Sequence, residues 1–409
     1  MKRSIIVIKI KQELDMRIGN NGFYRRAKRL VRMPREFIDT LRKMTPVCNV
    51  NQTNYTKNCL MMYITHPFTE KQNNDSHQNV RQAREIARLI GEFGYNVDVL
   101  QYDVRFARLN KKYELVFDIC AREKPVYGGK LSDAAKKIIY FTGSESVFAN
   151  QAELSRIQAA MERRGVILQP RRQAPLISKT VESFDCTILI GNAYNLQTYS
   201  GFDLKNVYLV PNTGYDFHFS FLPEKKSSKN FLFFGSGGSV HKGLDLLLEI
   251  FSEPGFPANL YVCGLFEQED DFVAAYRTEL YHTPNIIPIG FVDIWSDTFR
   301  DLTEKCAYTI LPSCSEGQAG SITTLMSAGV IPICSRECGF EADEAVLLPD
   351  CSMDSIRSCV LDYARKPLSW VEAKSAETLS IAQERFSEQA FSQKMQTALE
   401  SVLKRMADN

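Results

Sequence analysis

Short apolar runs alternate with longer amphipathic stretches from residue 59 onward. CLMMYIT, at residues 59–65, is followed by DSHQNVRQAREIARLIGEFGY and then by NVDVLQY. Gly94 stands at the end of the middle stretch, where a helix C-terminus favours glycine. The apolar residues of that stretch recur at helical spacing: Val80, Ala83, Ile86, Ala87, Ile90 and Phe93. The pattern predicts a strand, a helix and a second strand, as in a βα unit of a parallel sheet.

The same alternation continues in two series. YELVFDI, KKIIYFT, CTILIGN and NVYLVPN complete the first series, with a helix expected over residues 151–164. NFLFFGS, ANLYVCG, IIPIGFV, AYTILPS and VIPICS form the second. The charged, small-residue stretch at 225–229 lacks apolar periodicity and separates the two series. Two tandem, doubly wound α/β domains are therefore predicted.

The expected organisation has four parts. Residues 1–57 form a basic N-terminal extension and linker, and residues 58–224 form the first α/β domain. Residues 229–370 form the second, and 371–409 form C-terminal helices that pack back on the body. A chain of 409 residues exceeds the ~300 at which single cores stop growing, which agrees with two domains.

Positive charge is concentrated at the N-terminus. The formal net charge of the chain is +2, but residues 1–47 hold thirteen Lys and Arg against four Asp and Glu. Residues 17–45 combine this charge with an apolar stripe that Pro34 interrupts. Such a segment either lies on an anionic membrane surface or packs on the protein with a solvated basic face. Both alternatives stay open.

Other features favour a cytoplasmic protein, and the basic segment would allow it to lie at the inner face of the membrane. No apolar run approaches ~20 residues, and SIIVIKI near the N-terminus is too short and too charged for a signal sequence. The eleven cysteines show no paired C-x-x-C spacing and no companion histidine cluster, which favours free thiols in a reducing compartment. No cofactor or metal ligand set is apparent, so we expect metal-independent chemistry.

The strongest chemical signal is LPSCSEGQAGSITTLMSAGVIPICS, at residues 311–335. It predicts a strand, a loop of small residues around Glu316, a helix and another strand. Ligands of open α/β sheets bind at the carboxyl ends of strands, and the start of a helix favours an anion. Glu316 is therefore expected at a ligand site, the alternative being a carboxylate that only caps the helix. The small residues after it are Gly317, Ala319, Gly320 and Ser321.

A second signal is FLFFGSGGSVHKGLDLLLEIF, at residues 231–251. A strand enters the turn Gly235-Ser236-Gly237, and Lys242 precedes an amphipathic helix. The G-x-G-x-x-G pattern fails because Val240 replaces the third glycine, and no Walker pattern is present. Lys242 is a candidate to neutralise a diphosphate. The alternatives are a tight βα connection and a solvated lysine.

With these motifs, residues 59–400 resemble glycosyltransferases of the GT-B fold, in the large retaining family 4-like group. The resemblance implies two Rossmann-like domains, with the nucleotide-sugar donor held by the C-terminal one. Lys242 would contact the donor diphosphate, Phe291 and Val292 the nucleobase, and Glu316 the donor sugar near its reacting carbon. The remaining implied donor residues are Gly235, Ser236, Gly237, Gly317, Gln318, Ala319, Gly320, Ser321 and Thr324.

Two positions depart from the pattern of that group. Thr324 stands where a second glutamate normally contacts the ribose, and Ser236 replaces a basic residue in a turn that is one residue longer. In the N-terminal domain, His77 follows the loop after the first strand and either binds a sugar or acceptor group or only begins a helix. Thr142, Gly143 and Ser144 are weaker acceptor-side candidates.

The function expected from the resemblance is transfer of a sugar, with retention, from a nucleotide sugar to a glycan or lipid-linked acceptor in polysaccharide or glycan synthesis. Lys242 and the amides after Glu316 would stabilise the leaving diphosphate, and domain closure would exclude water. No nucleic acid partner is expected. The alternatives are a binding protein that has lost turnover and a nucleotide-sugar epimerase or phosphorylase.

Overall fold

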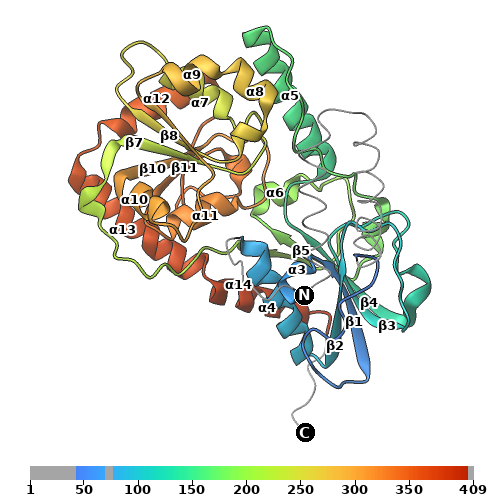
Figure 1. The fold of residues 1–409 in the computed structure, drawn as a ribbon. Helices are drawn as coiled ribbons and strands as arrows, with labels where there is room; N and C mark the ends of the chain where they lie inside the picture. The colour runs from blue at the N-terminus through green and yellow to red at the C-terminus, as the bar shows by residue number, and fades with distance from the viewer. Residues whose placement is uncertain (1–42, 70–76, 404–409) are drawn as a thin grey trace, which may run out of the picture.

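The computed structural model describes residues 43–69 and 77–403 (Figure 1). The predicted basic segment lies outside these ranges except for residues 43–45, as does most of the loop ahead of His77. Within the described ranges, no helix has the length and apolar character needed to cross a membrane.

The first sheet contains six parallel strands in the order β2-β1-β3-β4-β5-β6. At its centre Met61 of β1 lies opposite Val99 of β2 and Phe117 of β3. These side chains are fully buried because helices cover both faces of the sheet. The strands are β1 (Lys57–Tyr63), β2 (Tyr95–Gln101), β3 (Tyr113–Asp118), β4 (Leu131–Phe141), β5 (Cys186–Ile190) and β6 (Val207–Val210).

The second sheet is also parallel and runs in the order β12-β11-β10-β7-β8-β9. Its strands are β7 (Ser227–Phe234), β8 (Asn259–Cys263), β9 (Ile286–Gly290), β10 (Cys306–Leu311), β11 (Ile331–Cys334) and β12 (Val346–Leu347). Each predicted strand is present, and the two-residue edge strand β12 was not predicted. The predicted α/β class with two doubly wound sheets is confirmed.

The helices follow the apolar periodicity. All six apolar residues predicted for α4 are buried. Helix α5 begins at Ser146, five residues earlier than predicted, because the Glu145 carboxylate accepts from the amides of Val147 and Phe148. The helices are α3 (His66–Thr69), α4 (Gln78–Glu92), α5 (Ser146–Arg164), α6 (Ala193–Gln197), α7 (Leu244–Phe251), α8 (Asp270–Ala275), α9 (Arg277–His282), α10 (Asp297–Lys305), α11 (Gly320–Met326), α12 (Met353–Ala364), α13 (Leu368–Arg385) and α14 (Glu388–Glu400). Short 3-10 turns are η1 (Gly128–Lys130), η2 (Lys179–Ser183), η3 (Pro223–Lys225), η4 (Phe266–Gln268) and η5 (Arg336–Cys338).

The stretch at 225–229, expected to separate the two domains, is in part structural. Strand β7 already begins at Ser227. Lys226 is 5% exposed, and its ammonium group donates to the carbonyls of Thr303 and Cys306. Apolar periodicity does not reveal this lysine, because its role depends on carbonyl groups about 80 residues away.

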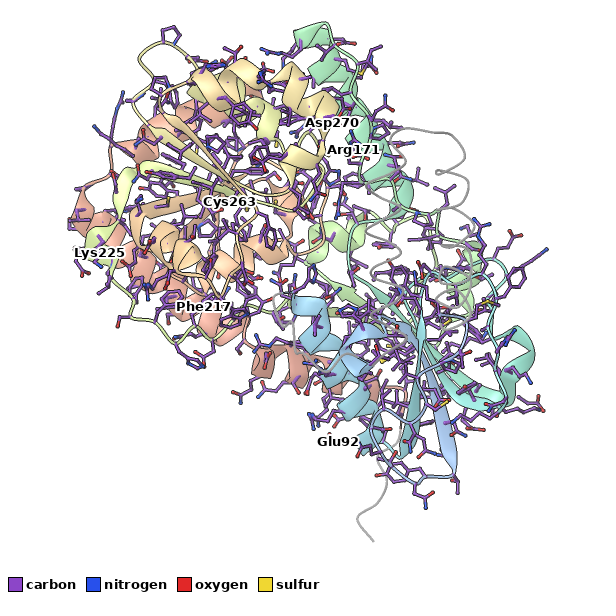
Figure 2. The ribbon with its side chains drawn as sticks, in the orientation of Figure 1. Glu92, Arg171, Phe217, Lys225, Cys263 and Asp270 are labelled. Carbon is purple, nitrogen blue, oxygen red and sulfur yellow. The ribbon has the colours of Figure 1, made fainter. Side chains whose placement is uncertain are left out.

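Helix α5 belongs by sequence to the first series but packs against the second. Ile157 and Ala160 of α5, and Leu168 just beyond it, join the apolar cluster around the β7 sheet. Arg163 donates to Asp245 over 2.6 Å, and Arg164 donates to Glu279 over 2.8 Å. Figure 1 shows α5 beside α8, and Figure 2 places Arg171, just beyond α5, at the same junction.

Helix α14 comes from the C-terminal end of the chain but packs against the first sheet. Phe391, Met395 and Leu399 pack in the cluster that contains Ile86 and Ile90 of α4. Each sheet is therefore covered partly by a helix from the other half of the chain. These two crossings fix the position of one sheet relative to the other, and with it the space between them.

Candidate active site

A cavity of about 620 Å³ opens between the two sheets, where the carboxyl ends of their strands face one another. Tyr63, Tyr102 and Thr142 line it from the first sheet, and Phe234 and Gly264 line it from the second. All predicted donor and catalytic residues except Gly237 line this cavity: His77, Gly235, Ser236, Lys242, Phe291, Val292, Glu316, Gly317, Gln318, Ala319, Gly320, Ser321 and Thr324.

Lys242 and Glu316 form an ion pair at the floor of the cavity. They follow β7 and β10, which are neighbours at the point where the strand order of the second sheet reverses. Their side chains are 6% and 12% exposed, and Ser313 donates a further hydrogen bond of 3.1 Å to the same Glu316 oxygen. Glu316 is therefore a paired carboxylate rather than a free helix cap.

The electrostatic surroundings keep Glu316 ionised. Burial by itself would raise the pKa of its carboxyl group, but the positive charge of Lys242, assisted by His241 and Arg172, outweighs burial and lowers that pKa to about 2. The carboxylate is thus charged at any physiological pH. A group of this kind positions or stabilises positive charge, and it does not donate a proton as a general acid near neutral pH.

The backbone of Glu316 is held by the N-terminal domain. Its carbonyl accepts from the Ser144 amide over 3.1 Å, from the Ser144 hydroxyl over 2.6 Å and from the Asn195 side chain over 3.2 Å. A Cβ atom at Gly317 would lie 2.7 Å from the Thr142 carbonyl oxygen. Glycine is needed at 317 because the two domains touch backbone to backbone. Ser144 therefore supports Glu316 directly, whereas Thr142 lines the cavity.

The amides of the Gly-rich turn are already engaged. The Gly238 amide donates to the Glu269 carboxylate over 2.6 Å, and the Ser239 amide donates to both of its oxygens over 3.2 Å. Gly237 lies against the same carboxylate and does not line the cavity, contrary to the prediction. No local sequence pattern reveals this contact, because Glu269 lies about thirty residues further along the chain.

Gly235 has a steric role. A Cβ atom there would lie 3.1 Å from the Cδ atom of Lys242. The glycine leaves room for the lysine stem to pass from the turn towards Glu316. This part of the turn thus positions Lys242, while Glu269 occupies the amides of the following two residues.

Thr324 holds the two domains together. Its hydroxyl donates to the Gly320 carbonyl over 2.7 Å and accepts from the Gln78 side chain over 2.8 Å. Gln78 also donates to the Gly320 carbonyl over 2.8 Å. At position 324 the resemblance would place a ribose-binding glutamate. The threonine that stands there contacts α4 instead. Gln318 is held in a similar way, since its side-chain oxygen accepts from the Asn212 amide over 2.7 Å.

Residues 228–362 match the family described as glycosyl transferases group 1. This matched region of the C-terminal domain is called the group 1 domain below. The match includes most of β7, Lys242, Glu316 and β11, so it covers the ion pair at the floor of the cavity. No curated protein matches the sequence.

Solved structures share the fold around this group 1 domain. Sucrose-phosphate synthase from Thermosynechococcus elongatus is similar with a TM-score of 0.56 at 11% identity, over 84% of this chain and 98% of that one. Anabaena HepE in complex with UDP-glucose gives 0.54 at 11% identity, over 84% and 100%. These likenesses show the fold alone, which is the GT-B arrangement of two Rossmann-like domains.

S. aureus TarM has a weaker likeness, with a TM-score of 0.46 at 12% identity over 70% of this chain. The chain spans about half of TarM, namely 54% of its length.

His77 stands on the opposite wall of the cavity from the group 1 domain. Its Nδ1 atom accepts from the Asn79 amide over 3.3 Å and caps α4, which accounts for one of its two ring nitrogens. The surrounding protein keeps water from the ring and so disfavours the charged imidazolium, which lowers the pKa of His77. The positive charges of His66 and Arg172 lower this pKa further. Both interpretations of His77 remain compatible with this geometry, because Nε2 is not used by the cap.

Phe291 and Val292 lie at the rim of the cavity, just after β9 of the group 1 domain. Phe291 is 69% exposed, whereas Val292 is buried in the apolar cluster beneath it. Exposed aromatic surface at a cavity mouth suits stacking against a planar ring. Val292 supports the turn and exposes little surface that a ligand could contact.

Two residues of the site have no sequence signal. His241 donates from Nε2 to the Ser315 carbonyl over 2.5 Å, and burial together with Lys242 and Arg172 lowers its pKa. It therefore fixes the loop before Glu316. Arg172 lines the cavity from the segment after α5. A dibasic pair in a loop predicts only solvent exposure, so the tertiary structure alone reveals this arginine.

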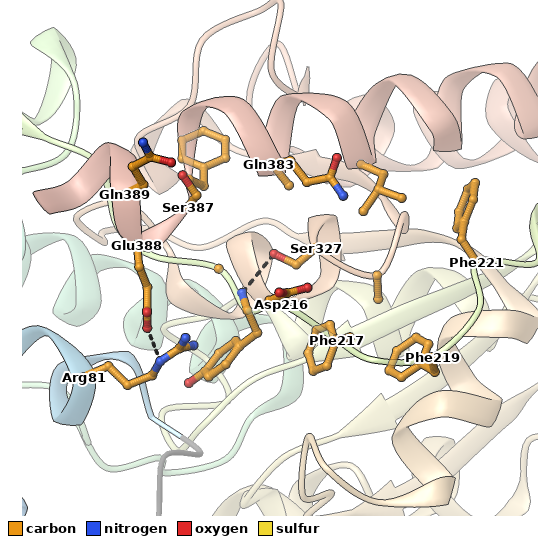
Figure 3. A pocket seen from close by; sticks show the side chains of 16 residues that line it. Arg81, Asp216, Phe217, Phe219, Phe221, Ser327, Gln383, Ser387, Glu388 and Gln389 are labelled. Carbon is orange, nitrogen blue, oxygen red and sulfur yellow. Dashed lines mark hydrogen bonds and ion pairs between the residues drawn. The ribbon is translucent and has the colours of Figure 1, made fainter. Parts of the chain in front are cut away.

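A separate cavity of about 480 Å³ lies between the linker 211–222 and helices α13 and α14 (Figure 3). Arg81 and Glu388 face each other across one end and form an ion pair, and the Arg81 guanidinium lies 5.1 Å from the Tyr215 ring centroid. None of the predicted site residues lines this cavity. Arg81 and Glu388 neutralise each other, which leaves Asp216 as the other charged residue of the lining. We assign the chemistry to the cavity of the group 1 domain, which the predicted site residues line.

Within residues 43–69 and 77–403, no three His, Cys, Asp or Glu side chains are grouped so as to hold a metal ion. Metal-independent chemistry by the group 1 domain stays a prediction.

Proposed function

We propose that this protein is a glycosyltransferase that moves a sugar from a nucleotide-sugar donor to a glycan acceptor. The observation that carries the proposal is the Lys242–Glu316 ion pair, which lies at the strand reversal of a group 1 domain and faces a cavity shared by both domains. The UDP-glucose in the Anabaena HepE structure supports a nucleotide sugar as the donor class.

The proposed chemistry is electrostatic. Lys242 neutralises part of the charge that develops on the leaving diphosphate, and the ionised Glu316 stabilises positive charge at the reacting carbon of the sugar. The backbone contacts of Ser144 and Asn195 with Glu316 keep that carboxylate in place during the reaction. Retention of configuration is part of this proposal, because the motifs around Lys242 and Glu316 resemble those of the retaining family 4-like group.

A second candidate is a GT-B protein that binds nucleotide sugars without turnover. One observation favours it: the Thr324 hydroxyl, at the position of the expected ribose contact, is engaged by Gln78. An epimerase is a third candidate. Incubation of the protein with a donor and no acceptor separates the three, because an epimerase changes the sugar, a transferase hydrolyses it slowly and a binding protein leaves it intact.

The principal test is a thermal-shift screen against a panel of nucleotide sugars, followed by mass spectrometry of products formed with glycan acceptors. We expect at least one donor to raise the melting temperature, and Glu316→Ala and Lys242→Ala to lose that response. Lys229→Ala, at an exposed position outside the cavity, is the control. If no donor stabilises the wild-type protein, or if both cavity variants respond like it, the assignment is wrong.

A lipid-linked acceptor at an anionic membrane is a further part of the proposal, and it rests on the charge of residues 17–45. The test is binding of the full chain to phosphatidylserine vesicles. Replacement of Arg25, Arg26, Lys28 and Arg29 by glutamine should abolish that binding. The control removes an equal charge from the exposed residues Lys112, Lys124, Lys130 and Lys229. Equal binding by both variants would contradict membrane contact through this segment.

A further inference from the structure

Arg172 reaches the donor cavity from a segment that the structure fixes firmly. The buried Glu153 carboxylate of α5 accepts from the Arg172 amide over 2.8 Å and from the Arg171 amide over 2.9 Å. The same carboxylate accepts from the Gln173 side chain over 2.7 Å. Glu153 is 1% exposed, so this carboxylate is committed to holding the segment. The backbone of Arg172 is therefore positioned before any ligand binds.

The side chain of Arg172 crosses from this segment onto the Gly-rich turn of the other domain. A Cβ atom at Gly238 would lie 2.5 Å from Arg172 Cγ and 3.0 Å from its Cδ. The aliphatic stem thus rests on the bare backbone of Gly238. Beyond the stem, Arg172 lines the cavity that contains Lys242 and Glu316. Its charge is felt there, because it contributes to the low pKa of Glu316.

Its lack of a carboxylate partner distinguishes Arg172 from Lys242, the other basic residue discussed for this cavity, among the described residues. Lys242 is already neutralised by Glu316, and the amides of Gly238 and Ser239 are taken by Glu269. Among the described residues, no carboxylate lies within ion-pair distance of Arg172. Its neighbour Arg171, in contrast, pairs with Asp271. Asp293, the other carboxylate that lines the cavity, accepts from the Trp295 amide over 2.9 Å.

A diphosphate linked to a nucleoside and a sugar carries one negative charge on each phosphate. Lys242, paired with Glu316, compensates less than its full charge, so a second cation would strengthen the binding of a diphosphate. An arginine fork suits this role because it donates two parallel hydrogen bonds to phosphate oxygens. We propose that Arg172 binds the donor diphosphate from the N-terminal half of the chain, opposite Lys242. This inference rests on the proposed function, and it makes donor binding depend on residues of both domains.

The test uses Arg172→Gln in the full chain, with Arg171→Gln as the matched control. The two arginines are adjacent, but only Arg172 lines the donor cavity. The probes are UDP, GDP and ADP, each compared with its monophosphate by calorimetric titration. We expect the diphosphate that binds the wild type best to bind Arg172→Gln about 10 to 100 times more weakly, as for loss of a charge-assisted hydrogen bond. The affinity for the matching monophosphate should fall less.

A third variant distinguishes a loss of diphosphate binding from a folding defect. Arg172→Lys keeps the charge and an aliphatic stem on Gly238, and it should bind the diphosphate with an affinity between the wild type and Arg172→Gln. Equal diphosphate affinities for Arg172→Gln and Arg171→Gln would overturn the role of Arg172 and leave the donor site intact. If the wild type binds none of the three diphosphates, the proposed function itself fails, and the inference with it.

Discussion

Lys242 and Glu316 form an ion pair across 74 residues of sequence, and both side chains are almost excluded from solvent. The pair joins the turn after β7 to the loop after β10. Taking two charges out of water is costly unless each finds its partner, so the geometry of either loop depends on the other. The pair is thus both part of the candidate active site and a constraint on its shape.

Breaking this ion pair should change stability and sugar transfer in different ways. Lys242→Met leaves a buried carboxylate without its partner, and we expect the free energy of unfolding to fall by about 3 kcal/mol. Adding Glu316→Gln removes the isolated charge, so the double variant should regain most of that stability. Sugar transfer should be absent from both. Urea denaturation and a transfer assay measure the two effects, and additive losses of stability in the double variant would contradict direct coupling.

The low pKa of Glu316 predicts a pH dependence with a definite sign. The folded-state value of about 2 lies below the reference value of 4.5. The ionised group therefore stabilises the fold above pH 4.5, and this contribution is lost as the pH falls from 4.5 towards 2. Relative to Glu316→Gln, the wild type should lose roughly 3 kcal/mol over that range. Denaturation curves at pH 7, 5, 4 and 3 test this, with Glu123→Gln, at an exposed site, as the control.

A side chain should not be tolerated at Gly317, whereas nearby Gly143 should tolerate one. A Cβ atom at 317 would lie 2.7 Å from Thr142 O, 3.0 Å from Gly143 Cα and 3.0 Å from Ile190 O, all of them backbone atoms that cannot rotate away. Gly317→Ala should therefore push the domains apart, cost about 1 to 3 kcal/mol and reduce transfer. No heavy atom lies within 4 Å of a Cβ built at Gly143, so Gly143→Ala is the control. Limited proteolysis and a transfer assay give the comparison, and equal behaviour of the two variants would refute this explanation.

The crossing of α14 predicts that a C-terminal residue stabilises the N-terminal sheet. Met395 is 0% exposed in the core of that sheet, and Met395→Ala should cost about 2 to 5 kcal/mol. Hydrogen exchange should quicken first in β1 and β5, which share its apolar cluster. The neighbouring exposed residue provides the control, since Lys394→Ala should change stability by less than about 0.5 kcal/mol. Faster exchange confined to the second sheet would contradict the prediction.

The sequence by itself determined the elements and the centre of the site. Apolar periodicity defined the strands and α4, because burying one face of a helix or both faces of a parallel strand leaves a local pattern. Glu316 and Lys242 were found because each follows a predicted strand, near small residues, and parallel strands bring such ends to one edge of a sheet. Local patterns were enough for these conclusions.

Only the tertiary structure decided which partners these residues have. Gln78 contacts Thr324 from 246 residues away, and α5 leaves its own sheet to pack on the other. Glu269 occupies the amides of the Gly-rich turn, and Arg172 reaches the cavity instead. Periodicity shows that a helix has an apolar face, but not which of two sheets it covers. A buried carboxylate or an exposed arginine likewise finds its partner through the packing of the whole chain.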